Sequence, residues 1–143
     1  MSNPKGEGKK ESYTFPNGDK YRGTMKEGKP EGRGNITFVN GLDKFEGLFV
    51  KGKREGHGKR INHDGSYYEG DYKNDKPHGK GIYRWSDTEI YEGQWQYGVF
   101  EGFGKKISEG AVYEGNWKDG LPNGHGKCIF ADQSTYDGNW KDG

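Results

Sequence analysis

The sequence predicts an all-β protein: an elongated, single-layer antiparallel β-meander of about twelve strands, twisted and gently concave. One observation behind this prediction is a repeat, with steps of 22 to 24 residues, that covers nearly the whole chain. Another is the period-two alternation of side chains between turn signals, which is typical of strands. The third is composition: 27 glycines and 15% aromatic residues, but only 27% hydrophobic residues, cannot enclose a rounded core. A repeat array needs no such core, because each unit packs its large side chains against its neighbours.

The chain begins with a polar, lysine-rich segment, residues 1–12, that shows no periodicity. We interpret it as a flexible lead-in, and residues 13–143 as an array of about six repeats, the last one incomplete. The array opens with a strand at Tyr13-Thr14-Phe15 and a turn at Pro16-Asn17-Gly18. Similar turn signals, each expected to join two strands, return at Asn40-Gly41, Asp64-Gly65 and Glu109-Gly110.

Each repeat is predicted to be a hairpin whose first strand carries an aromatic-x-Gly-x-aromatic signature. The three signature residues lie on one face of the strand, because side chains alternate between the two faces. The signature occurs at Tyr21, Gly23 and Met25; Phe45, Gly47 and Phe49; Tyr68, Gly70 and Tyr72; Tyr91, Gly93 and Trp95; Tyr113, Gly115 and Trp117; and Tyr136, Gly138 and Trp140. Met25 in place of an aromatic residue fits an atypical terminal unit.

The second strand of each hairpin carries Gly-x-Gly followed by aromatic residues at alternate positions. A loop such as residues 118–123 is expected to connect the two strands. The pairs are Gly32/Gly34, Gly56/Gly58, Gly79/Gly81, Gly102/Gly104 and Gly124/Gly126. An inward glycine leaves room for an aromatic ring from the neighbouring strand, so rings lying over glycines are expected to replace a second layer.

The rings are expected to gather in clusters, weakened where the pattern fails. One predicted cluster contains Tyr83, Trp85, Tyr91 and Trp95, and part of another contains Tyr113, Trp117, Cys128 and Phe130. The third unit has Arg60 and Asn62 where aromatic residues are expected. The fifth unit is one residue short, which places Ile107 in its last aromatic slot when counted back from Tyr113. We expect weak joints at both units.

The repeat resembles the MORN (membrane occupation and recognition nexus) repeat, whose pattern reads roughly Y-x-G-x-W-x-x-G-x-x-x-G-x-G-x-Y-x-F-x-D-G. The cleanest copy is residues 113–127, and the resemblance covers about residues 13 to 143. It implies a non-enzymatic scaffold that presents an aromatic-lined, concave face to another protein. The similarity to MORN proteins of cilia, flagella and the cell cortex, radial-spoke head components included, implies a cytoskeletal assembly, with the axoneme as the leading context.

Two alternatives come from other functional classes. A membrane-tethering module would contact anionic lipid, phosphoinositide included, or an acidic partner. Its candidate residues are the basic cluster Lys51, Lys53, Arg54, Lys59 and Arg60. The resemblance also allows a regulatory segment of a larger enzyme, as in plant phosphoinositide kinases or a SET-domain methyltransferase. That reading requires a catalytic domain beyond Gly143.

Net charge, hydrophobic patterning and cysteine content indicate which partners and which compartment to expect. A net charge of +1 gives no overall field that favours nucleic acid, and we expect none to bind. The sequence contains no apolar run of signal-peptide or transmembrane length. Its single cysteine, Cys128, fits a reducing compartment. We therefore expect a cytoplasmic, cytoskeletal protein.

The glycine pairs, histidines, cysteine and glutamates are better explained by structural roles than by catalysis or metal binding. No phosphate-binding loop follows any Gly-x-Gly pair, and the four histidines lack the spacing of metal ligands. Cys128 is expected to pack as a small hydrophobic side chain. The outward glutamates Glu46, Glu69, Glu92 and Glu114 are expected to form a ladder that faces lysines. The sequence therefore predicts no catalytic residue, metal or cofactor.

The last strand of the array, Tyr136 to Trp140, has no following partner strand in these 143 residues. Such an edge exposes unpaired N–H and C=O groups, which natural sheets usually cover or pair. We expect this edge to pair with a second copy of the chain, giving a homodimer, or with further repeats.

Overall fold

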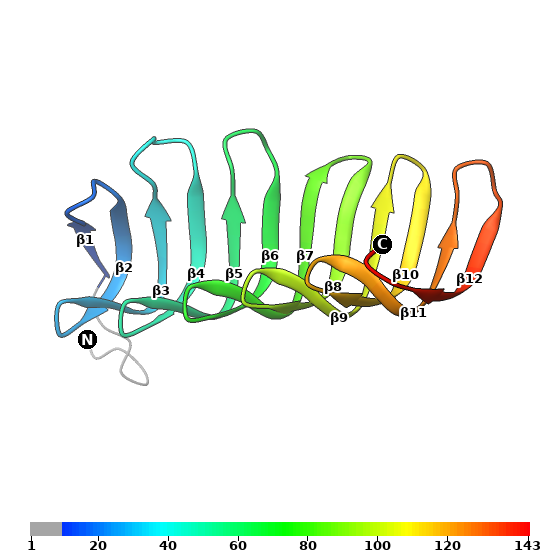
Figure 1. The fold of residues 1–143 in the computed structure, drawn as a ribbon. Helices are drawn as coiled ribbons and strands as arrows, with labels where there is room; N and C mark the ends of the chain where they lie inside the picture. The colour runs from blue at the N-terminus through cyan, green and yellow to red at the C-terminus, as the bar shows by residue number, and fades with distance from the viewer. Residues whose placement is uncertain (1–9) are drawn as a thin grey trace.

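The computed structural model describes residues 10–143, which form one open sheet of twelve antiparallel strands in sequence order (Figure 1). The strands are β1 (Lys10–Thr14), β2 (Lys20–Lys26), β3 (Lys29–Thr37), β4 (Lys44–Val50), β5 (Lys53–Ile61), β6 (Tyr67–Lys73), β7 (Lys76–Ser86), β8 (Glu89–Gln96), β9 (Val99–Ser108), β10 (Ala111–Lys118), β11 (Leu121–Ile129) and β12 (Thr135–Trp140). Over this part of the chain there is no helix that could cross a membrane. The predicted single-layer meander is confirmed.

The first strand begins earlier than the sequence indicated. Lys10, Glu11 and Ser12, which fall within the predicted lead-in, pair with β2 as the start of β1. The rest of that lead-in, residues 1–9, lies outside the described residues. Within the described residues, the array therefore starts at Lys10.

Every full repeat bends where its Gly-x-Gly pair lies. In β10 and β11, Gly115 pairs with Gly126 but Trp117 pairs with Pro122, so residues 123–125 of β11 face a single residue of β10. Gly124 has φ +93° at this bulge, in the left-handed region that glycine adopts most readily. Figure 1 shows the result, with upright hairpins joined to a second set of hairpins turned to one side. The predicted concavity is therefore an angle between two arms.

The turned-aside hairpins close in tight turns. Asp119 and Gly120 have φ values of +53° and +83°, the pattern of a two-residue type I′ turn, which matches the twist of the flanking strands. The prediction of a loop over residues 118–123 is wrong, because Lys118 and residues 121–123 belong to β10 and β11. Two positive φ angles in succession let the chain reverse within two residues, so no longer loop is needed.

In each full repeat, the first ring of the aromatic-x-Gly-x-aromatic signature lies over a pair of glycines. Gly93 and Gly104 are cross-strand partners, and a Cβ atom added to Gly93 would lie 2.8 Å from the Tyr91 hydroxyl oxygen. That hydroxyl donates a hydrogen bond of 2.7 Å to the carbonyl oxygen of Gln94. The glycines thus make room for the ring, and the backbone satisfies its polar end.

The rings form one continuous column, and the predicted cluster of Tyr83, Trp85, Tyr91 and Trp95 is present and joins this column at Trp95. Trp95 packs edge-to-face on Tyr91 of its own repeat and on Tyr68 of the preceding repeat, with centroid distances of 5.2 and 5.1 Å. Its indole N–H donates to the carbonyl oxygen of Gly81 at 3.0 Å. The same alternation runs through Tyr21, Phe49, Phe45, Tyr72, Tyr68, Trp95, Tyr91, Trp117, Tyr113, Trp140 and Tyr136. Each repeat is therefore joined to the next by aromatic contacts.

The column fills the inside of the angle between the arms. Its rings from Tyr21 to Trp117 are 0 to 7% exposed, although the described sheet has one layer. Burial of this degree in a single layer requires cover from both arms. Phe100, which the sequence analysis did not single out, stacks on Tyr91 at 4.0 Å, whereas Phe130 is 40% exposed and stays outside the column.

Neighbouring repeats are also joined by hydrogen bonds at the turned-aside hairpins. The backbone N–H of Gly52 donates to the carbonyl oxygen of Pro30, one repeat earlier. The N–H of Lys51 donates to the Glu31 carboxylate at 3.0 Å, and Asp119 donates to Glu101 in the same way at 3.1 Å. These bonds fix the spacing of successive turns, because backbone groups of one turn are satisfied by the previous repeat.

At the two irregular units the ladder stays paired. Arg60 and Asn62 lie on the ring side, where Asn62 donates to the Tyr83 hydroxyl at 3.1 Å. The placement of Ile107 in an inward slot is wrong: Ile107 pairs with Val112 on the opposite face, and Lys106 points inward over Trp85. The fifth unit is one residue shorter because its turn, residues 109–110, is short. The register between β9 and β10 is continuous.

We expect the buried tyrosines to make the fold sensitive to alkali. Burial raises the pKa of Tyr21 and of Tyr72 from 10 to about 12, whereas in the unfolded chain they ionise near 10. The folded state therefore keeps protons that the unfolded state releases, so this contribution to stability is full below about pH 10 and is lost as the pH rises through about 12. Circular dichroism and tyrosinate absorbance, recorded together, should show one coincident transition. Titration of every tyrosine near pH 10 with an unchanged sheet signal would contradict this prediction.

Candidate functional site

The two faces of the sheet differ in what they leave available to another molecule. The ring face, which carries the aromatic column, is occupied by the protein's own side chains. The opposite face, here called the outer face, carries the residues that alternate with the rings, and Glu114 and Asn116 are exposed there beside buried Tyr113. The predicted aromatic-lined binding face is therefore mostly core. Trp85 and Tyr136 remain 37% and 43% exposed on the ring face, whereas exposed groups follow the outer face along its length.

The outer face carries a row of charged residues that are cross-strand neighbours from β2 to β12. This charged row consists of Arg22, Asn35, Glu46, Lys59, Glu69, Ile82, Glu92, Lys105, Glu114, Lys127 and Asp137. From Glu46 onward, acid and base alternate with one exception. The predicted ladder of glutamates facing lysines is present, and neighbours of opposite charge stabilise the sheet.

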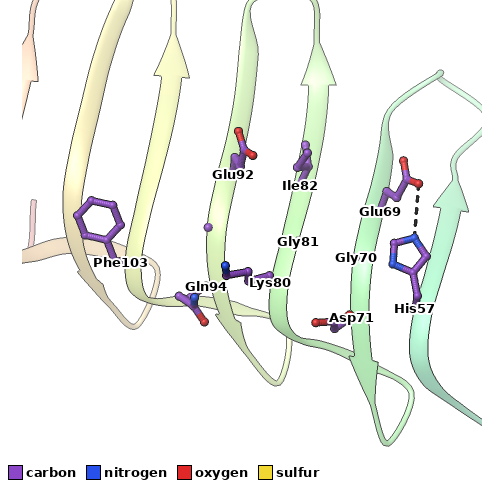
Figure 2. A pocket seen from close by; sticks show the side chains of 11 residues that line it. His57, Glu69, Gly70, Asp71, Lys80, Gly81, Ile82, Glu92, Gln94 and Phe103 are labelled. Atoms are coloured by element: carbon purple, nitrogen blue, oxygen red, sulfur yellow. Dashed lines mark ion pairs between the residues drawn. The ribbon is translucent and has the colours of Figure 1, made fainter.

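The exception is Ile82 on β7, which lies directly between Glu69 on β6 and Glu92 on β8. Every other position between two acids of this row, from Glu46 to Asp137, is a lysine. Glu69 and Glu92 therefore each have one lysine neighbour in the row, whereas Glu114 has two. Figure 2 shows Glu69, Ile82 and Glu92 at the same level across three strands.

A groove of about 480 Å³ opens over this position. Asp71, Lys80 and Gln94 line it on the side of the bend, and Phe103 lies at its β9 side (Figure 2). Phe103 is 56% exposed, which is unusual for an aromatic residue in this chain. The groove thus combines carboxylates, an apolar floor and an aromatic ring, which together suit a positively charged group on an apolar stem.

Next to the charged row runs an apolar row, also on the outer face. It is apolar except for Arg84, and consists of Ile61, Tyr67, Arg84, Ile90, Ile107, Val112 and Ile129, each the cross-strand partner of the next. Ile61 and Ile129 are 42% and 38% exposed, and the rest are half-buried. An apolar strip bordered by charges has the composition of many protein–protein interfaces.

The structure separates the five residues of the predicted basic cluster. Lys51 and Lys53 are at the exposed turn between β4 and β5, and Lys59 takes part in the charged row. Arg54 and Arg60 instead point to the ring face. The five residues are therefore not gathered on one surface.

The two arginines are held by neighbours on the ring face. The Arg54 guanidinium lies 5.4 and 5.5 Å from the ring centroids of Phe45 and Tyr72, and pairs with Asp75 at 3.2 Å. The Arg60 guanidinium lies 4.3 Å from the Phe38 ring and pairs with Asp43 at 3.5 Å, which explains how an arginine occupies an aromatic slot.

Cys128 and three of the histidines have structural surroundings. Cys128 is buried, and burial raises the pKa of its thiol. His57, His63 and His125 each pair with one carboxylate, that of Glu69, Asp43 and Asp137 respectively. Within residues 10–143, no three His, Cys, Asp or Glu side chains come together in a way that could hold a metal ion.

A comparison with protein families identifies the repeat. The model of the MORN repeat family matches five segments: residues 21–42, 45–67, 68–88, 91–109 and 113–135. The chain belongs to the MORN repeat family. MORN repeats generally mediate contacts with proteins or membranes. A comparison with curated proteins found no match.

The MORN register shows how Ile82 and Phe103 could have been found from the sequence. Ile82 is the residue that follows Gly-x-Gly, where the neighbouring MORN repeats have Lys59 and Lys105. Phe103 is the residue between the two glycines, where His57, Lys80 and His125 are polar. Comparing equivalent positions would have revealed both departures. Their proximity in one groove follows from the cross-strand register, which pairs β7 and β9 with the same strand, β8.

Proposed function

We propose that this protein is a non-enzymatic scaffold that binds other proteins through the outer face of its MORN sheet, in a cytoskeletal assembly. The axoneme of a cilium or flagellum, with a radial-spoke-like role, is the assembly we propose, on the resemblance to MORN proteins of those structures. The observation that carries the proposal is the difference between the faces: the column rings from Tyr21 to Trp117 are buried, while the charged row is largely exposed and the apolar row is half-buried or exposed.

The shape of the sheet supports a scaffold role. Consecutive repeats share aromatic contacts and turn hydrogen bonds, so the ribbon holds the outer rows in a fixed line. A partner can thus contact several repeats at once, and the energy of each small contact adds to the others because the ribbon is already ordered. This is the behaviour expected of extended repeat surfaces.

The test uses a pair of variants with the same chemical change. Ile107→Glu places a carboxylate in the apolar row, and Val39→Glu places one in the exposed turn between β3 and β4. Tagged proteins are used to capture partners from an extract of ciliated cells, followed by quantitative mass spectrometry. We expect the wild type and Val39→Glu to retain the same axonemal proteins, and Ile107→Glu to lose them. Equal retention by Ile107→Glu, or a wild-type capture without cytoskeletal proteins, would reject the proposal.

A second candidate function, membrane tethering, rests on Lys51 and Lys53, which are exposed at one turn. Each basic group near an anionic surface contributes about 1 kcal/mol, so these residues support only weak attachment. Co-sedimentation with phosphoinositide-containing vesicles should show binding that disappears near 0.5 M salt, where the screening length falls to about 4 Å. Binding that survives such salt would show that these charges are not responsible.

The carboxy-terminal edge is a further surface for association. Within residues 10–143, β12 pairs with β11 alone, and Tyr136 on it is 43% exposed. Two copies that pair through this edge would form a closed twofold dimer, and additional repeats would cover the edge in the same way. We predict that light scattering will find the 143-residue chain associated, and that Trp140→Lys will shift it towards monomer. A monomer whose state Trp140→Lys leaves unchanged would contradict this prediction.

A further inference from the structure

We propose that the groove over Ile82 is a docking site for a lysine or arginine side chain from an extended, basic segment of a partner protein. The proposal rests on the proposed function, since it assumes a protein partner on the outer face, and it names the chemistry of that partner. The bound cation would stand between Glu69 and Glu92, where the charged row lacks a lysine of its own.

Charge complementarity is the first support. The row supplies a lysine between Glu46 and Glu69, between Glu92 and Glu114, and between Glu114 and Asp137. Among the positions between two acids of the row, only the one between Glu69 and Glu92 has a neutral residue. A cation from outside would complete the alternation of charge, with one carboxylate neighbour on each side, Glu69 and Glu92.

The shape of the groove is the second support. Isoleucine is shorter than lysine and uncharged, so this position of the row has neither the length nor the charge of a lysine side chain. The groove of about 480 Å³ has an apolar floor at Ile82, which suits the methylene stem of lysine or arginine. The exposed ring of Phe103 adds a face on which a cation is favourable.

The two basic residues that line the groove, Lys80 and His57, do not occupy the position between Glu69 and Glu92. Lys80 lines the groove from the adjacent row, and no ion pair of residues 10–143 joins it to Glu69 or Glu92. His57 pairs with Glu69 at 3.5 Å but approaches from β5, on the side away from Ile82 (Figure 2). Glu92 has neither of these contacts. The carboxylates around Ile82 also disfavour an anionic lipid surface, so a protein segment is the occupant that fits.

The test is to place a lysine of the chain itself between Glu69 and Glu92. Ile82→Lys adds the missing lysine to the row at an outward, half-buried position, so the strand register should be unchanged. The 15N-labelled chain is titrated with an acetylated and amidated tetralysine peptide. In the wild type we expect saturable shifts of the amide signals of Gly81, Ile82 and Gly93, and in Ile82→Lys at least tenfold weaker binding. The amide spectrum of the variant without peptide reports whether its fold is intact.

A second variant removes a lysine from the charged row. Lys105→Ile places an isoleucine between Glu92 and Glu114, and tetralysine should then also shift amide signals of β9 and β10. Shifts spread over all acidic positions, equal affinity of Ile82→Lys, or no shift in the wild type would each overturn the proposal. Tetralysine binding without capture of cytoskeletal proteins would reject the assembly proposed above but keep the docking site, so the two failures are distinguishable.

Discussion

Replacing Gly93 with valine is expected to remove most of the stability of the sheet. A Cβ atom at this position would lie 2.7 Å from the carbonyl oxygen of Phe103 and 2.8 Å from the hydroxyl of buried Tyr91. The first contact is with backbone, so β8 and β9 would have to separate. We expect a loss of about 4 kcal/mol or more, a large part of the roughly 5–15 kcal/mol that holds a typical domain together. Urea unfolding followed by circular dichroism measures it.

Glu92→Val is the matched control for this substitution. It introduces the same side chain at the adjacent residue of β8, where the side chain points to the outer face. The free energy of unfolding should change by about 0.5 kcal/mol or less, because exposed strand positions accept β-branched residues. Equal midpoints for Gly93→Val and Glu92→Val would show that the two faces have been assigned the wrong way round.

Trp95→Ala is expected to destabilise the protein by about 3 to 5 kcal/mol, the usual cost of removing a buried tryptophan. The change deletes the edge-to-face contacts with Tyr91 and Tyr68, so it interrupts the aromatic column between the third and fourth repeats. It also leaves the carbonyl oxygen of Gly81 without the indole donor. Thermal unfolding, monitored by circular dichroism, measures the loss.

Trp95→Phe separates the contribution of the ring contacts from that of the indole hydrogen bond. Phenylalanine keeps a ring in the column, as Phe49 does at the same position of the second repeat, but it cannot donate a hydrogen bond. The expected cost is about 1 to 3 kcal/mol, the range for an unsatisfied buried acceptor. If Trp95→Ala cost no more than Trp95→Phe, the aromatic column would not be the element that joins the repeats.

Much of the fold could be predicted because its rules are local. The signature residues Tyr113, Gly115 and Trp117 alternate along one strand, so their shared face follows from strand geometry alone. The pairing of strands follows from the repeat, because the turn signals leave only short connections between neighbours. Twelve strands in sequence order, with the rings buried and the glutamates outward, match these expectations.

The candidate site was harder to predict, because its residues become neighbours only across strands. The run from Lys51 to Arg60 looks like one basic cluster in the sequence. Alternation within β5 instead sends Arg54 and Arg60 to the ring face and Lys59 to the outer face. The groove over Ile82 combines residues from β5 to β9, between His57 and Phe103, and no short motif contains them.

The sequence by itself determined the all-β class, the number of strands and the facing of the aromatic and glycine positions, because these depend on period-two alternation and on turn chemistry within each repeat. Only the tertiary structure decided that the sheet bends at every Gly-x-Gly and that the rings form one column. The bend depends on the bulge opposite Asn116 and its equivalents, where three residues of one strand face one of the next. That register is a relation between strands, so it determines which face closes into a core and which remains open to a partner.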